Sequence, residues 1–221
     1  MRKWCIFLVG IVAFGLILVV EGIYILRNRP DLILMGMVKL QKYQVIPLVE
    51  LGSTEIKLRS LVNLAELRSE QMGDVYELVK SRSKVDIPSV SGNNKVELVF
   101  DEMLSKVDYI SLFEPNSKEL VKLFYLLGLK ANEIGENQMV IPLWEMTLRL
   151  APYWSYFYME LANYYLDKGQ REESLEVIDY CLLFEYAKKG CLYYYDNQIV
   201  PNRPLEVGAY RGYVEENFMA E

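Results

Sequence analysis

The chain has 221 residues, of which 52% are hydrophobic and 24% are charged, and its formal net charge is −6. This balance excludes a disordered or low-complexity protein. Histidine is absent, which excludes Ser-His-Asp and Cys-His catalysis, histidine acid–base chemistry and the usual histidine-containing zinc sites. The negative charge argues against nucleic acid as the main partner, because phosphate binding needs a cationic face.

The N-terminal segment is a long apolar run. Seventeen residues, Trp4–Val20, carry no charge, and beyond one glutamate the apolar stretch extends to Leu26. At about 1.5 Å per residue the run spans roughly 25–35 Å, enough for the hydrocarbon core of a bilayer. We therefore predict an N-terminal transmembrane anchor in residues 1–29, with residues 4–26 in the membrane. The alternative is a signal peptide that is cleaved before Ile23.

The orientation of this single span stays open. A short basic N-terminus before an apolar run is typical of a signal anchor that exports the C-terminal part of a chain, so we expect the residues after the span to lie outside the cytoplasm. Arg27 and Arg29 lie on the other flank of the run, and by the positive-inside rule they favour the opposite orientation.

Two cysteines, Cys181 and Cys191, lie ten residues apart near the expected end of a helix. In an oxidising compartment they can form a disulfide, whereas in a reducing one they are two ordinary thiols. Neither histidine nor a further nearby cysteine completes a set of four ligands, so we expect no metal here.

The next part of the chain is predicted to consist of a helical segment followed by an irregular one. Residues 30–93 read as a membrane-proximal helical segment and linker, with a helix over 54–80 and a Ser-, Pro-, Gly- and Asn-rich loop over 81–94. Residues 94–221 form the expected main domain, which begins with an amphipathic helix over 94–111.

Residues 121–154 and 155–188 repeat each other at a spacing of 34. Each unit is predicted to be a helix, a glycine turn and a second helix. Small residues at matching positions allow the two helices to approach closely, and large aromatic residues fill the volume around them. The aligned pairs include Phe124 and Tyr158, Gly128 and Ala162, Ala131 and Tyr165, Gly135 and Gly169, and Trp144 and Ile178.

This pattern resembles the tetratricopeptide repeat. The second unit, with LANYYLDKGQREES, is the better match, and the first departs from the family at Val140, where a small residue is usual. The resemblance covers about a third of the chain. It implies an all-α fold in which helical hairpins stack into a groove that receives a peptide or a helix. A loop over 188–204 and a C-terminal capping helix over 205–219 are expected to complete the stack.

Catalytic and cofactor motifs are missing from the sequence. It has no P-loop, no dinucleotide-binding glycine pattern and no nucleophile elbow. The carboxylate pairs lie on charged helices, and nothing places two of them across a cleft. We therefore expect a protein that is not an enzyme, with no catalytic residue, no cofactor and no metal.

The last third of the chain has the features of a recognition surface. Residues 151–221 hold twelve of the seventeen tyrosines and twelve Asp or Glu against six Lys or Arg. Tyrosine, methionine and asparagine on one helical face combine apolar area with hydrogen-bonding tips. If the resemblance holds, the residues expected to line the groove and bind a partner are Lys122, Tyr125, Leu129, Tyr156, Met159 and Asn163.

These observations predict a membrane-anchored helical-repeat adaptor or scaffold that binds a partner protein or peptide, neutral or basic in charge. Two alternatives stay open. One is a structural subunit of a multiprotein cell-envelope membrane complex. The other is an accessory regulator of a membrane enzyme.

Overall fold

The structure is a computed structural model that describes residues 52–70, 72–73, 75, 85–112 and 118–219. The chain divides into two compact units, Met1–Leu64 and Ala65–Glu221, and each is treated by itself. The predicted anchor lies outside the described residues. In the described part of the chain, no helix is both long enough and apolar enough to cross a bilayer.

The described residues contain helices and no strand, which confirms the all-α fold class for this part of the chain. Helix α4 crosses the boundary between the two units, and the described elements after it belong to the second unit. The elements are α4 (Thr54–Glu70), α6 (Asn94–Leu104), α7 (Tyr109–Leu112), α8 (Glu119–Glu133), α9 (Asn137–Leu150), α10 (Ser155–Asp167), α11 (Arg171–Cys181), α12 (Glu185–Tyr194), the π-helical turn η1 (Tyr195–Ile199) and α13 (Arg211–Met219).

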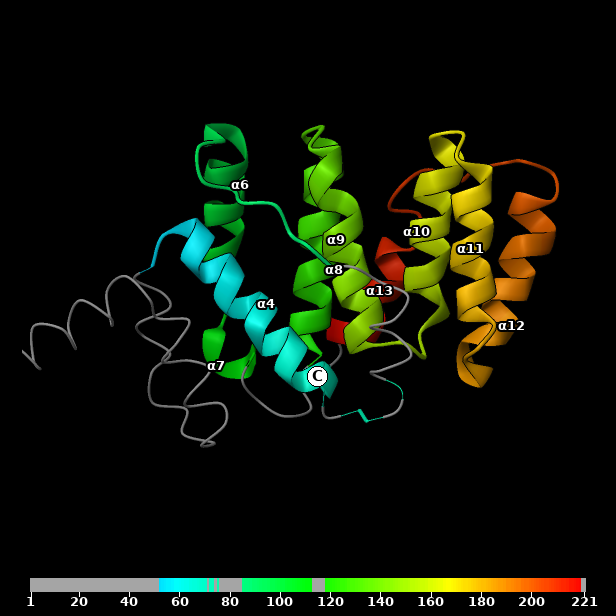
Figure 1. The fold of residues 1–221 in the computed structure, drawn as a ribbon, viewed down its shortest axis with the longest axis horizontal. Coiled ribbons are helices and arrows are strands. Elements are labelled where there is room, and N and C mark those ends of the chain that lie inside the picture. Colours follow the sequence, from blue (N-terminus) through cyan, green and yellow to red (C-terminus); the bar gives the residue numbers. More distant parts are fainter. Residues whose placement is uncertain (1–51, 71, 74, 76–84, 113–117, 220–221) are drawn as a thin grey trace, which may run out of the picture. The chain divides into compact units, whose positions relative to one another are not determined.

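Two helical hairpins, α8–α9 and α10–α11, form the centre of the second unit and stand side by side in Figure 1. Their turns are built alike at the predicted spacing of 34 residues. Gly135 and Gly169 both have positive φ, 81° and 74°, a conformation that suits glycine at the end of a helix. The following amide then donates back across the turn, Glu136 to Ala131 and Gln170 to Tyr165, each at 2.8 Å. The arrangement is consistent with a helical repeat.

The first hairpin closes around one small residue. Gly128 on α8 faces the Trp144 ring on α9 so closely that a Cβ atom at position 128 would overlap the indole. The indole Nε1 donates to the Tyr125 carbonyl oxygen at 3.0 Å, and its ring meets Tyr164 of α10 edge-on at 5.6 Å. Trp144 therefore joins the two hairpins, and the glycine makes room for it.

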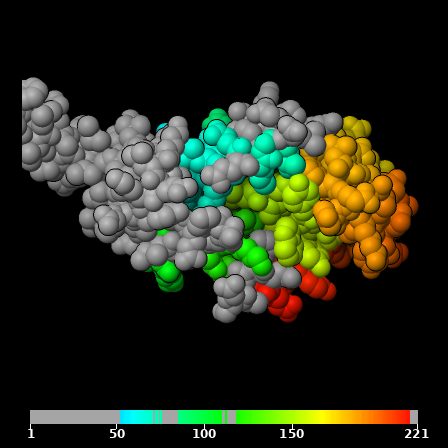
Figure 2. Space-filling view, turned by 90° about the horizontal axis from the view of Figure 1, so that it is seen from below, coloured from blue at the N-terminus to red at the C-terminus, as the bar shows by residue number. Residues whose placement is uncertain are grey.

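Residues 188–199 are helical, so the prediction of a loop over 188–204 is wrong for this stretch. The helix buries Ala187, Cys191 and Tyr194, which recur at the spacing of one helical face. Gly190 allows α12 to approach α10, because a Cβ atom there would overlap Ser155. Figure 2 shows α11 and α12, in orange, as one continuous surface. Packing of one face against α10 thus gives this tyrosine-rich stretch its helical structure.

A disulfide joins Cys181 at the end of α11 to Cys191 in the middle of α12. Both cysteines are buried. Beyond η1 the chain turns back, and α13 packs against α8 rather than extending the row beyond α12. Helix α13 therefore lies beside the helix that opens the first hairpin.

The predicted helix over 94–111 is divided into α6 and α7. Asn93 caps the first of them by accepting from the Val96 amide at 3.3 Å. The Tyr109 hydroxyl at the start of α7 donates to the Leu104 carbonyl oxygen at 3.1 Å. This bond occupies a carbonyl at the end of α6, where a helix leaves such groups without an internal partner.

Replacing Gly128 by Ala is expected to destabilise the protein by about 1–3 kcal/mol, because the added methyl group must displace the Trp144 ring. The matched control is Gly212→Ala in α13, where a Cβ atom would meet nothing within 4 Å. The control should keep or slightly raise the stability, since alanine favours a helix. Chemical denaturation measures both, and equal stabilities of the two variants would contradict the packing described.

Candidate partner-binding site

The face of α8 and α10 that was expected to receive a partner holds residues 205–213 of the same chain. We define the inner face by five residues of these two helices: Tyr125, Leu129, Tyr156, Glu160 and Asn163. The covering segment follows η1 and includes the first residues of α13. Its hydrogen bonds to Glu160 and Asn163 are made through main-chain atoms, and its tyrosine rings add further contacts.

Asn163 forms two hydrogen bonds with the main chain of Leu205, one as the donor and one as the acceptor. Its Nδ2 donates to the Leu205 carbonyl oxygen at 2.9 Å, and its Oδ1 accepts from the Leu205 amide at 2.6 Å. The same Oδ1 accepts from the Tyr194 hydroxyl of α12 at 3.3 Å. These partners use both polar atoms of a fully buried amide and fix the orientation of its plane.

Glu160, one turn earlier on α10, is also fully buried. Its carboxylate accepts from the Gly208 amide, from the Tyr210 amide at 3.3 Å and from the Tyr125 hydroxyl at 3.3 Å. Burial raises the pKa of this carboxyl to about 6, while the two amides and the hydroxyl oppose the rise. Two turns of one helix thus hold the covering segment at three of its residues.

Aromatic and small residues complete the contact. The Tyr156 ring stacks on Tyr213 with ring centres 5.0 Å apart, and it meets Tyr210 at 5.9 Å. Gly208 has a φ of 92°, and a Cβ atom there would lie 3.4 Å from Leu129 Cδ2. Glycine therefore suits this position both by its backbone conformation and by the space available.

The six residues predicted to bind a partner divide into two groups. Tyr125, Leu129, Tyr156 and Asn163 belong to the inner face. Met159 is buried beneath α12, with its sulfur 3.9 Å from where a Cβ atom of Gly190 would lie. Lys122 lies elsewhere, beside Glu119 at 3.6 Å, on a groove of about 560 Å³ between α6, α7 and α8.

Sequence reasoning did not single out Glu160, which accepts from the amides of two residues of the segment. A signal was present, because Glu160 lies four residues after Tyr156 and three before Asn163, on the same helical face. A carboxylate flanked by buried positions on such a face needs donors, and the glycine-containing segment supplies them.

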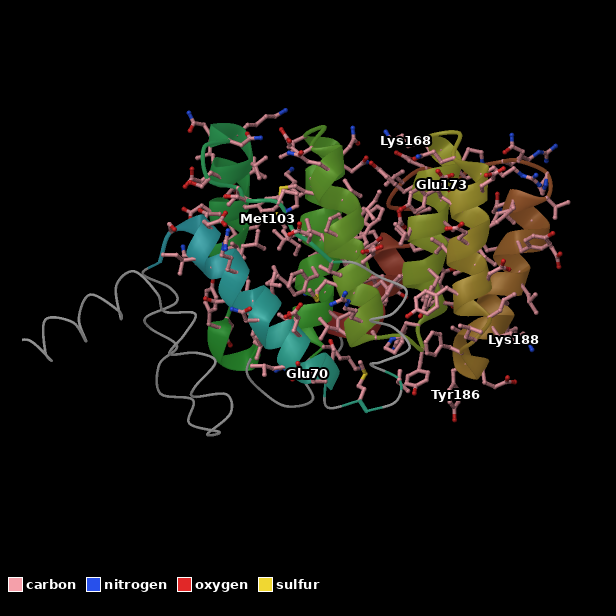
Figure 3. The ribbon with its side chains drawn as sticks, in the orientation of Figure 1. Glu70, Met103, Lys168, Glu173, Tyr186 and Lys188 are labelled. Atoms are coloured by element: carbon pink, nitrogen blue, oxygen red, sulfur yellow. A yellow bond between two sulfur atoms is a disulfide. The ribbon has the colours of Figure 1, made fainter. Side chains whose placement is uncertain are left out.

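Two other features of the second unit lie away from the inner face. Glu145 of α9 lines a pocket of about 380 Å³ together with three more acidic residues, Glu173, Glu176 and Asp179. Burial raises the pKa of Glu145 to about 7, against the opposing charge of Arg149. Tyr186, at the start of α12, is 85% exposed and points away from the helices (Figure 3).

No group of histidine, cysteine or acidic side chains in the described part of the chain has the arrangement of a metal site. Comparison of the chain with protein-family models, with characterised proteins and with solved structures found no match. The site must therefore be interpreted from its own geometry.

The stability of the protein is expected to fall as the pH rises from about 4.5 to about 7. Glu145 and Glu160 have raised pKa values in the folded chain, so in this window the folded state binds more protons than the unfolded state. Through Glu145, the wild-type protein should lose on the order of 1–3 kcal/mol of folding stability between pH 4.5 and 7.5. The Glu145→Gln variant should not show this loss. Urea denaturation at several pH values measures it, with the exposed Glu172→Gln as the charge-matched control. An unchanged pH dependence in Glu145→Gln would contradict the burial described.

Proposed function

We propose that this protein is a membrane-anchored helical-repeat adaptor that binds a partner protein or peptide on its inner face. The observation that carries the proposal is the hold of Asn163 and Glu160 on the main chain of Leu205, Gly208 and Tyr210. A helix face that binds an irregular segment through its backbone is suited to peptide recognition, because every peptide offers the same main-chain groups. The tyrosines around it add apolar area with polar tips.

The finer parts of the proposal are supported by the sequence and by local geometry. The apolar run of residues 4–26 supports a single membrane-spanning anchor. The 34-residue spacing and the two like-built turns support membership of the tetratricopeptide repeat family. The absence of histidine supports a binding role over an enzymatic one.

We further propose that the helical domain lies outside the cytoplasm, on the support of the Cys181–Cys191 bond.

Site-specific photocrosslinking tests the binding role. A photoreactive amino acid replaces Tyr156 of the inner face in the full-length protein, in membranes of cells that naturally make it. The matched control carries the same group in place of Tyr186, an exposed tyrosine of α12 outside the inner face. We expect one defined crosslinked protein from position 156 and none of it from position 186. Equal products from both positions, or none from position 156, would contradict the adaptor proposal.

The proposed location predicts the state of the cysteines in cells. The chain has three cysteines. Protein whose thiol–disulfide state has been trapped, and which is then unfolded, should take up one polyethylene-glycol maleimide, on Cys5, when Cys181 and Cys191 are bonded. Reduction before labelling should raise the uptake to three, which a gel shift resolves. Uptake of three without reduction would contradict an oxidising compartment, and an unlabelled chain without Cys5 would indicate a cleaved N-terminus.

A further inference from the structure

The covering segment has the burial pattern of a bound ligand rather than that of a core element. None of residues 205–213 is buried, whereas Tyr125, Glu160 and Asn163 beneath them are fully buried. Among residues 201–216, Val214 is the one whose side chain is buried. A core helix would instead place an apolar stripe inside the protein. The side chains of the segment therefore contribute few fully buried groups, and the segment is held by main-chain hydrogen bonds and by the ring contacts of Tyr210 and Tyr213.

The groups left behind by a release of the segment can all be hydrated. Glu160 and Asn163 present a carboxylate and an amide to the main chain of the segment, and the hydroxyls of Tyr125 and Tyr194 donate to these two side chains. The carboxylate and the amide exchange a main-chain partner for water at low net cost, because folding itself only exchanges such bonds with water. An incoming peptide can in turn replace the water with its own amides and carbonyls.

The inner face also specifies the chemistry of its occupant. Asn163 requires a residue that presents both its amide and its carbonyl, as Leu205 does. Glu160 accepts from two amides that lie two residues apart and, as a buried carboxylate, opposes acidic segments. The approach of Leu129 to Gly208 favours glycine, and the Tyr156 ring favours an aromatic residue shortly after it.

We propose that the inner face is a binding site for a neutral or basic peptide that forms a turn at a glycine and carries an aromatic residue shortly after it. The C-terminal segment, residues 205–214, is the resident competitor that this peptide displaces. The proposal rests on the proposed adaptor function and names its partner class. A tethered segment competes at a millimolar effective concentration, so the full-length chain binds such a partner more weakly than the open face does.

The test uses a fluorescein-labelled synthetic peptide of residues 203–215, RPLEVGAYRGYVE, and the full-length chain in mild detergent. Gly208→Ala weakens the resident segment and leaves the inner face intact, because alanine is strained at a φ of 92°. The matched control, Gly212→Ala, adds the same methyl group where nothing lies within 4 Å. Fluorescence anisotropy should show the peptide bound about tenfold more tightly by Gly208→Ala than by wild type, and Gly212→Ala should match wild type.

A second substitution locates the peptide. Asn163→Asp in the Gly208→Ala chain keeps the side-chain volume but removes the donor to the peptide carbonyl, so binding should fall at least tenfold while circular dichroism stays unchanged. Unaltered binding would overturn the assignment of the site. Failure of a folded Gly208→Ala chain to bind the peptide overturns this inference, whereas the crosslinking result at position 156 decides the adaptor function separately.

Two further outcomes also overturn the inference. An unfolded Gly208→Ala chain would show that residues 205–214 belong to the core. A Gly208→Ala chain that forms a dimer by light scattering and excludes the peptide would show that the segment passes to a second copy instead of yielding to a partner.

Discussion

The requirement that buried polar groups find hydrogen-bond partners shapes the second unit around α10. Glu160 and Asn163 lie fully buried on a helix whose other positions are largely apolar. Leaving either without partners would cost several kcal/mol. Main-chain groups of Leu205, Gly208 and Tyr210 supply most of the partners, and the hydroxyls of Tyr125 and Tyr194 supply the rest. Burial raises the pKa of both hydroxyls, so they remain protonated donors. The path of the C-terminal segment and the burial of α10 therefore depend on each other.

The hairpins could be predicted from sequence because their determinants are local or periodic. Gly135 and Gly169 mark turns that glycine alone adopts readily, and Gly128 faces Trp144 across a single hairpin. Helix α12 was missed because Pro201 and Pro204 indicated a loop that was extended back to Lys188, in a stretch where Gly190 also weakens the helical pattern. The glycine is explained by the approach of Ser155, a contact with a residue distant in sequence. The local sequence pattern around Gly190 could not reveal this long-range contact.

The inner face was predictable in part. Helical spacing placed Tyr156 and Asn163 on one face, where the polar tip of asparagine was expected to meet a binding partner. The structure supplies that partner from Leu205, 42 residues further along the chain. No periodic signal predicts such a long-range return, because it depends on where η1 ends and on the direction in which Gly208 turns the segment. The role of Glu160 follows from the same return, and for this reason it was missed.

Hydrogen–deuterium exchange at the amides of Leu205, Gly208 and Tyr210 in the full-length chain tests the central claim most directly. Each of these amides donates to a side chain of α10, so exchange should be slow in wild type. In Asn163→Ala, which removes the oxygen that accepts from the Leu205 amide, it should become faster at residue 205, while α8 and α9 keep their protection. Exchange of the three amides at the rate of an unprotected chain in the wild-type protein would contradict the account.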